Sequence, residues 1–252
     1  MPDYINIRYW KILSASYSQL LEKMDGWRKD GNRHYVCFCD GNGLPLAWHR
    51  DVELRKAYAG ADAVCPDGLS VEVLARLFGG MDTKRLMGPE LFARAIETGV
   101  TRGWRHFFYG TDNATLAALK ANVERRWPDV QVVGTFAPEF SADPQLPPIE
   151  AGTVDRFLWV SLGCPKQEKW CARHLNELCV PVLLPVGAAF DFLAGTVREP
   201  PRWILCLGMN WLWRLLTGGR RVFLRNIKCV SGAFLIVLRE FVRIKVLGRT
   251  YG

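Results

Sequence analysis

Short runs of apolar residues alternate along the chain with segments whose apolar residues recur every three or four positions. The first kind of segment predicts buried β-strands, and the second predicts amphipathic α-helices. Because the two kinds alternate, we expect an α/β fold with a mostly parallel sheet and helices on both of its faces. The predicted strands cover residues 35–39, 63–65, 104–109, 130–133, 157–162 and 180–186. The predicted helices cover residues 69–78, 88–102, 113–126, 166–177 and 210–217.

Four of the predicted strands are followed by loops that mix glycine with polar residues. The carboxyl ends of parallel strands meet at one edge of a sheet, and ligands bind at that edge. Four such loops together indicate a Rossmann-like body with a site the size of a nucleotide. Neither the G-x-G-x-x-G fingerprint nor a Walker phosphate loop is present. The four loops cover residues 40–43, 66–68, 110–113 and 163–167.

Asp67 in the second of these loops has two interpretations. It stands just before a predicted helix, where an Asp side chain usually accepts a hydrogen bond from a free backbone N–H and caps the helix. A carboxylate at the edge of a sheet can also act as a catalytic base. The local sequence leaves both interpretations open.

The charge of the chain is concentrated in its last part. The 252 residues carry a net charge of +8, and residues 198–252 hold eleven Lys and Arg against two acidic residues. The rest of the chain is close to neutral. We therefore expect two parts, a body over residues 1–197 and an appendage over residues 198–252 that meets an anionic partner. A nucleic acid, an anionic membrane and a phosphorylated ligand all fit this charge.

The appendage contains a basic amphipathic segment. Its longest uncharged run, residues 229–238, is too short to span a bilayer. Its basic side chains fall near one helical stripe with large apolar side chains opposite, which suits a helix lying in a membrane interface. The alternative is a helix that packs its apolar face on the body. The basic residues are Arg221, Arg225, Lys228, Arg239 and Arg243, and the apolar ones are Phe223, Ile227, Phe234, Leu238 and Val242.

The cysteines and the first residues indicate the compartment. The eight Cys form no C-x-x-C pair and the chain has four His, which disfavours a zinc site. Scattered cysteines inside apolar runs are typical of reduced, buried thiols. The first eleven residues lack the apolar segment of a secretion signal. We therefore expect a cytoplasmic location.

Several motifs follow one another in a distinctive order. PDGLSVEVLARLFGG is followed by KRLMGPELF, WRHFFYGTDN, GCPKQEKW and VGAAFDFLAG, and then by PRW, GMNWLWRLL and a pair of arginines. Over residues 35–226 this order resembles the WecG/TagA/CpsF family of bacterial glycosyltransferases. The resemblance implies an inverting enzyme that uses no metal and no cofactor. It would transfer a sugar from a UDP-sugar to a polyprenyl-diphosphate-linked sugar at the cytoplasmic face of the plasma membrane. Such enzymes make exopolysaccharide, teichoic acid or common antigen.

The resemblance also assigns roles to individual residues. It implies that Asp67 is the catalytic base and that the appendage closes over the active site. The backbone N–H groups of the loop over residues 110–113 could also face uridine or phosphate, because this loop leads into the N-terminus of a predicted helix. The implied donor-binding residues are Asp40, Asn42, Gly110, Thr111, Gln167 and Asp191. The implied ligands of diphosphate or acceptor are Arg85, Arg214, Arg221 and Arg225.

The sequence departs from the family pattern at a few of these places. Asp40 stands where a small hydroxyl residue is usual, and Gly218-Gly219 replace a Glu-Pro pair in the appendage. These changes leave open an alternative, a non-catalytic membrane-associated module that binds a nucleotide-sugar. A nucleic-acid-binding protein is disfavoured, because the charge is confined to an amphipathic segment and no nucleic-acid motif is present. The apolar face of that segment also leaves a homo-oligomer open.

Overall fold

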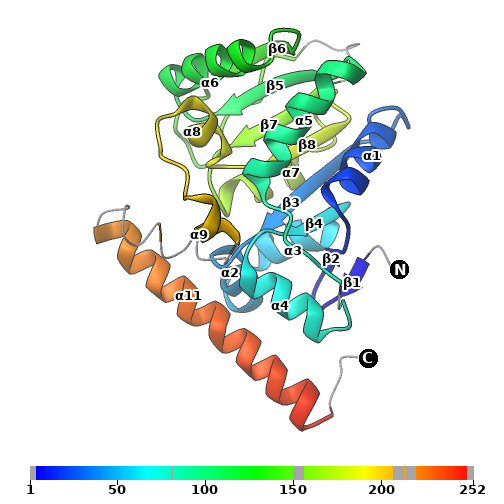
Figure 1. The fold of residues 1–252 in the computed structure, drawn as a ribbon, viewed down its shortest axis with the longest axis vertical. Helices are drawn as coiled ribbons and strands as arrows, with labels where there is room; N and C mark the ends of the chain where they lie inside the picture. The colour runs from blue at the N-terminus through cyan, green and yellow to red at the C-terminus, as the bar shows by residue number, and fades with distance from the viewer. Residues whose placement is uncertain (1–3, 81, 150–155, 207–212, 214–219, 249–252) are drawn as a thin grey trace.

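The computed structural model describes residues 4–80, 82–149, 156–206, 213 and 220–248, and its body is a layered α/β structure (Figure 1). The central sheet has six strands in the order β4-β3-β8-β7-β5-β6, and every neighbouring pair is parallel. This confirms the predicted fold class, and the ends of each predicted strand differ from those of an observed strand by at most three residues. The strands are β3 (His34–Cys39), β4 (Ala63–Pro66), β5 (Arg105–Gly110), β6 (Gln131–Phe136), β7 (Arg156–Ser161) and β8 (Val182–Pro185).

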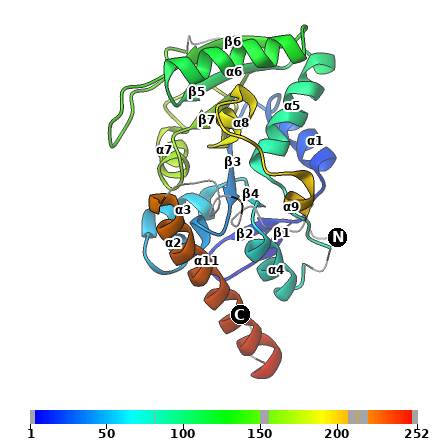
Figure 2. The same ribbon diagram turned by 60° about the vertical axis from the view of Figure 1, so that its left-hand side comes forward.

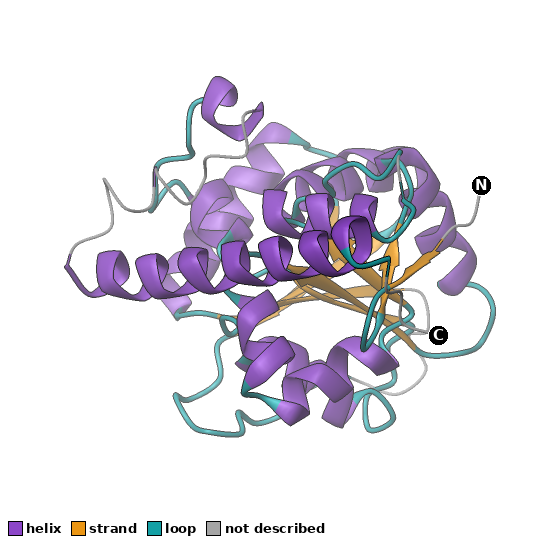
Figure 3. Ribbon diagram, turned by 90° about the horizontal axis from the view of Figure 1, so that it is seen from below, coloured by secondary structure: helices purple, strands orange, loops and turns teal. Residues whose placement is uncertain are grey.

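Helices cover both faces of the sheet, as Figure 3 shows from below. The helices predicted over 69–78, 88–102, 113–126 and 166–177 are α4, α5, α6 and α7. The helix predicted over 210–217 lies, apart from Trp213, outside the described residues. The helices are α1 (Tyr17–Trp27), α2 (Gly43–His49), α3 (Val52–Gly60), α4 (Leu69–Leu77), α5 (Gly88–Arg102), α6 (Asn113–Arg126), α7 (Lys166–His174), α8 (Ala189–Ala194), α9 (Arg202–Cys206) and α11 (Arg220–Phe241), which continues as a π-helical turn over Val242–Val246.

The N-terminal part adds elements that the apolar pattern did not predict. β1 (Tyr4–Asn6) and β2 (Lys11–Leu13) form a separate antiparallel pair, and α1 follows. The start of α1 has a capping box, in which Gln19 N donates to Ser16 Oγ at 3.2 Å and Ser16 N donates to Gln19 Oε1 at 2.8 Å. A Ser followed three residues later by Gln is a helix-start signal, so α1 could have been found from the sequence.

The core consists of two apolar layers, one on each face of the sheet. In β7, Phe157 and Trp159 pack in the layer with α1, α5, α6 and α8. Leu158 and Val160 pack in the other layer, with α2, α3, α4 and α7. Successive side chains of a strand point to opposite faces, so a strand buried on both faces reads as a continuous apolar run.

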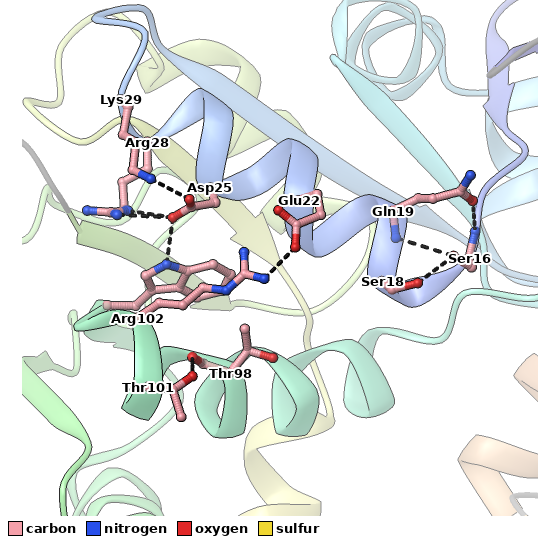
Figure 4. A network of polar contacts seen from close by, with 11 residues as sticks. Ser16, Ser18, Gln19, Glu22, Asp25, Arg28, Lys29, Thr98, Thr101 and Arg102 are labelled. Atoms are coloured by element: carbon pink, nitrogen blue, oxygen red, sulfur yellow. Dashed lines mark hydrogen bonds and ion pairs between the residues drawn. The ribbon is translucent and has the colours of Figure 1, made fainter.

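A polar cluster joins α1 to the end of α5 (Figure 4). Asp25 accepts hydrogen bonds from Trp104 Nε1 at 2.8 Å, from an Arg28 nitrogen at 3.0 Å and from Lys29. Burial raises the pKa of Asp25, but the hydrogen bonds from Lys29, Arg28 and Trp104 outweigh it and bring the pKa to about 2. The cluster thus ties α1 to the segment that follows α5, although the two are far apart in the sequence.

Candidate functional site at the carboxyl edge of the sheet

The turns that follow β3, β4, β5 and β7 meet at the carboxyl edge of the parallel sheet. Two backbone hydrogen bonds join them in pairs. Asp67 N donates to Cys39 O at 3.0 Å, which ties the turn after β4 to the end of β3. Thr111 N donates to Ser161 O at 2.9 Å, which ties the turn after β5 to the end of β7. The structure therefore brings together the four loops on which the sequence placed the site.

Asp67 lies at this edge, half-buried, just before α4. The residue at the N-cap position of α4 is Gly68, which has no side chain that could make a capping hydrogen bond. Gly68 fits closely against the neighbouring turn, because a Cβ added to it would lie 3.0 Å from Gly41 N and 3.3 Å from the Cα of Asp40. Asp67 thus stands one residue before the N-cap position of α4, and its role as the catalytic base stays a prediction.

Asp40 and Asn42 form a turn that opens α2. The Asp40 carboxylate accepts hydrogen bonds from Asn42 N at 2.9 Å, Asn42 Nδ2 at 2.8 Å and Gly43 N at 2.7 Å. Asp side chains favour such turns because they bond to the backbone just ahead of them. Asp40 thus orients the Asn42 amide, while contact of either residue with a donor sugar stays a prediction.

Gln167 lies in the first turn of α7 and is 5% exposed. Its Nε2 donates to Glu168 Oε1 at 3.0 Å and to Pro185 O at 3.1 Å, and its Oε1 accepts from Gly163 N at 3.1 Å. The side chain therefore joins the turn after β7 to the end of β8. A contact with the donor stays a prediction, and it would have to use Oε1, because both amide hydrogens already have acceptors.

The turn after β5 has a backbone that only certain residues tolerate. Gly110 has φ +113°, and a Cβ there would lie 2.2 Å from Ser161 O, so no side chain fits. Thr111 also has a positive φ, of 49°. Asp112 caps α6 by accepting from Thr115 N at 2.8 Å, a hydrogen bond that lowers the pKa of Asp112. The Thr111 N–H is engaged by Ser161, so binding of uridine or phosphate by this turn stays a prediction.

Arg85 is held by a buried carboxylate. Its Nε lies 3.1 Å from Glu72 Oε2, and Glu72, which is 8% exposed, also pairs with Arg76. The Arg85 side chain is therefore mostly buried, with 15% of it exposed. Its contact with diphosphate or acceptor stays a prediction. Asp191 is half-buried in the first turn of α8, and its contact with the donor likewise stays a prediction.

The remaining predicted ligands belong to the appendage. Arg214 lies outside the described residues, and Arg221 and Arg225 lie in α11 with side chains that are not described. These three predictions therefore stay open.

The sequence reasoning missed Glu168, which is 1% exposed at the edge of the site. Burial raises the pKa of its carboxyl group to about 7, and the nearby charge of Asp40 adds to the rise. A signal for its burial was present, because Glu168 stands three residues before Cys171 on α7, and residues at this spacing share a helix face. Cys171 is fully buried.

The long C-terminal helix rests on the two helices that begin at this edge. α11 runs past α2 and α4 (Figure 2) and buries Ala233 and Ile236 against them. At Gly232 a Cβ would lie 3.1 Å from the Pro45 side chain, so the helices approach closely there. The face away from the body is apolar and exposed, and we call it the apolar stripe. The apolar stripe consists of Ile227, Phe234, Leu235, Leu238, Phe241 and Val242.

The structure thus combines parts of both sequence interpretations of this helix. It packs on the body, but through small and medium side chains, and its largest apolar side chains face outward beside the exposed Lys228 and Arg239. None of the helices in the described ranges has the length and hydropathy needed to cross a membrane. Among the same residues, no group of three or more His, Cys, Asp or Glu could hold a metal ion.

Comparison with known proteins adds to this geometry. Residues 5–246 match the model of a family described as the glycosyl transferase WecG/TagA/CpsF family. Two relatives carry the name N-acetylglucosaminyldiphosphoundecaprenol N-acetyl-beta-D-mannosaminyltransferase. The one from Bacillus spizizenii strain W23 is 28% identical over 163 residues, which are 64% of this chain and 63% of that protein. The one from Bacillus subtilis strain 168 is 22% identical over 174 residues, which are 69% and 68% of the two chains. The match thus spans a little less than two thirds of the first relative.

Proposed function

Because the chain belongs to the WecG/TagA/CpsF family of glycosyl transferases, we propose that it transfers a sugar from a UDP-sugar to a polyprenyl-diphosphate-linked sugar. The sugar is a hexose or an N-acetylhexosamine, the anomeric centre is inverted and no metal ion takes part. The product is an intermediate in the synthesis of a cell-surface polysaccharide, which is an exopolysaccharide, a teichoic acid or common antigen. The names of the two relatives make N-acetylmannosamine, and an acceptor of N-acetylglucosamine on undecaprenyl diphosphate, the first pair to test.

The observation that carries this proposal is the position of Asp67. It lies half-buried at the carboxyl edge of the sheet, one residue before Gly68, which holds the N-cap position of α4. A carboxylate in this place can take the proton from the acceptor hydroxyl as the hydroxyl oxygen attacks the anomeric carbon. Attack from the face opposite the departing diphosphate inverts the anomeric centre in a single step.

The departing UDP carries the negative charge that develops in the transition state. Arg85, positioned by Glu72, is the described residue that we assign to this charge. Arg214, Arg221 and Arg225 of the appendage add to it when the appendage closes over the site. Arginine suits this role because its planar group can form paired hydrogen bonds with phosphate oxygens. The sequence contains no Asp-x-Asp, the usual element for a metal-bound diphosphate.

The remaining residues of the edge hold the donor. Asn42, oriented by Asp40, and Gln167 contact the sugar side of the donor, and Asp191 binds the ribose hydroxyls. The turn at Gly110 approaches the nucleotide closely with its backbone, since no side chain fits there. The assignments of Asn42, Gln167 and Gly110 are supported by the position of their turns along one edge, and that of Asp191 by its place in the first turn of α8.

The first test measures UDP release in the presence of EDTA. A panel of UDP-sugars is combined with a short-chain polyprenyl-diphosphate-linked N-acetylglucosamine. We expect acceptor-dependent release from one donor, lost by 10²-fold or more in Asp67→Asn, in the range ascribed to general base catalysis, ~10²–10⁴-fold. Asp129→Asn, an exposed change far from the edge, is the matched control and should retain the wild-type rate. Donor binding without transfer to any acceptor would favour the non-catalytic binding module instead.

We also propose that residues 198–252 associate the protein peripherally with the anionic cytoplasmic face of the plasma membrane. The support is the apolar stripe together with the basic side chains beside it. An apolar helix face flanked by Lys and Arg can lie in a membrane interface without crossing it, and each basic residue near an anionic surface adds about 1 kcal/mol of attraction. A lipid-linked acceptor requires this location.

Pelleting with anionic vesicles tests the membrane surface. Leu238→Glu and Phe241→Glu place a charge in the apolar stripe and should abolish pelleting. Val52→Glu adds the same charge at a position on α3 that is 55% exposed and outside the apolar stripe, and it should pellet like the wild type. Unchanged pelleting of the stripe variants would refute the proposal. A loss of self-association without a loss of pelleting would make the stripe an oligomer contact.

A further inference from the structure

Glu168 stands at a junction between two of the turns that form the site. It lies in the first turn of α7, directly after the 163–167 turn, and its side chain is buried against the end of β3, where the 40–43 turn begins. Its Oε1 accepts from Gln167 Nε2 at 3.0 Å. Among the described residues, Oε2 has no hydrogen-bond partner. The proposed mechanism has no use for this carboxyl group, yet burying a carboxyl group of which one oxygen lacks a hydrogen-bond partner is costly.

Other polar groups converge beside it. The Tyr58 hydroxyl, Asp40 Oδ1 and Cys164 Sγ all lie within 3.5 Å of the point that a Cβ on Gly43 would occupy. The Cys164 thiol in turn contacts the Glu168 carboxyl group. The two turns therefore meet over a small polar cluster, and the glycine leaves room for it.

The groups that face Glu168 are neutral or negative. They come from every element packed around it: Cys37 and Cys39 from β3, Asp40 from the turn after it, Tyr58 from α3, Cys164 from the turn after β7 and Cys171 from α7.

The two lysines near Glu168 on the same helix point elsewhere. Lys169 lies 2.6 Å from Asp51, and Lys166 donates to Ser141 O. Within the described part of the chain, no Lys, Arg or His side chain forms an ion pair with the Glu168 carboxyl group. An ionised Glu168 would thus place a second carboxylate near Asp40 with no counter-charge from the described residues, and an approaching diphosphate would add a third anionic group.

We propose that Glu168 is a positioning residue that works as a neutral carboxylic acid, holding the 40–43 turn and the 163–167 turn together so that they bind the donor. Loss of its proton weakens the contact between the turns and lowers the affinity for the donor. The effect on the donor rests on the proposed function, whereas the effect on the two turns does not. Burial raises the pKa of Glu168 to about 7, so the change falls near neutral pH.

The first part of the test follows the two turns without any substrate. The backbone amide signals of Gly43 and Gly163 are recorded by NMR between pH 5.5 and 9 for the wild type and for Glu168→Gln. We expect both signals to shift with a common midpoint near pH 7 in the wild type and to lose this titration in Glu168→Gln. Glu97→Gln, an exposed change on α5, should leave the titration intact. Signals that do not titrate, or that titrate equally in Glu168→Gln, would overturn the proposal.

The second part measures the affinity for UDP by calorimetry at pH 6 and pH 8.5. We expect the Kd of the wild type to rise about fivefold more than that of Glu168→Gln, at the lower end of ordinary coupling between two sites. Protonation of UDP itself affects its binding to both proteins equally, so the difference between them reports the titration of Glu168 alone. Equal pH dependence in the two proteins would overturn the link to the donor. If UDP does not bind at all, the proposed function fails, and the amide titration still decides the role of Glu168.

Discussion

Replacing Glu168 with Gln should make the stability of the protein less dependent on pH. The change keeps the shape of the side chain and the oxygen that accepts from Gln167, but it removes the ionisable proton. In the folded protein, burial raises the pKa of Glu168 from 4.5 to about 7. The charged form is therefore disfavoured by folding. Stability should be constant below about pH 4.5, fall as the pH rises from there to about 7, and then level off.

The size of the effect follows from the shift in pKa. One unit corresponds to about 1.4 kcal/mol, so the rise at this fully buried group corresponds to about 3 kcal/mol of lost stability above pH 7. In a chain of this size, that loss equals roughly 6–12 °C in the thermal midpoint. Any constant difference between Gln and a neutral Glu appears equally at every pH, so it cancels from the comparison.

Thermal unfolding of both proteins between pH 4.5 and 8.5 provides the measurement. The midpoint of Glu168→Gln minus that of the wild type should increase with pH and level off near pH 8. Glu97→Gln, at an exposed position, should show no such increase. A difference that stays constant over this range would refute the reasoning, because it would mean that Glu168 titrates at the same pH in the folded and unfolded chains.

Two further changes test the packing and the polar contacts of the body. Gly99→Ala should lower stability by about 1–3 kcal/mol, because its Cβ would lie 2.6 Å from Nε2 of the buried His106. Gly26→Ala is the control and should not lower stability, because nothing lies within 4 Å of a Cβ at that position. Equal thermal midpoints for the two variants would contradict this prediction. Asp25→Asn should lower the thermal midpoint at neutral pH, because the folded-state pKa of about 2 makes the Asp25 carboxylate stabilising above about pH 4. That contribution is lost as the pH falls towards 2, so the deficit of the variant should shrink there, and a deficit that does not change with pH would show that charge is not its cause.

Most strands of the sheet could be predicted from the sequence because they are buried on both faces, whereas the edge strand β6 is only partly buried. Such strands are continuous apolar runs, and β7 and β3 stand out for that reason. α1 was missed although Ser16 and Gln19 form a capping box, because the apolar pattern alone was used to locate helices. The short helices α2 and α3 follow each other closely and carry too few turns for their periodicity to stand out.

The roles of single residues at the site were less readable. Asp67 has the sequence context of a helix cap, yet Gly68 takes that place. Arg85 pairs with Glu72, which lies thirteen positions earlier on α4, and nothing in the local sequence predicts this pair. Such pairings depend on which side chains the fold brings within a few ångströms of each other. The local sequence does not indicate which distant residues will come that close.

The sequence by itself determined the parallel sheet, the edge at which its polar turns gather, the family and the amphipathic character of the C-terminal helix. These follow from local patterns, since apolar period, glycine-rich turns and charge spacing act within a few residues. Only the tertiary structure decided that Ala233 and Ile236 face the body while Phe234 and Leu238 face outward. It alone decided that Glu168 is buried near Asp40 and that no described Lys, Arg or His pairs with it. Burial and electrostatic fields are sums over neighbours from distant parts of the chain, so they exist only once the chain has folded.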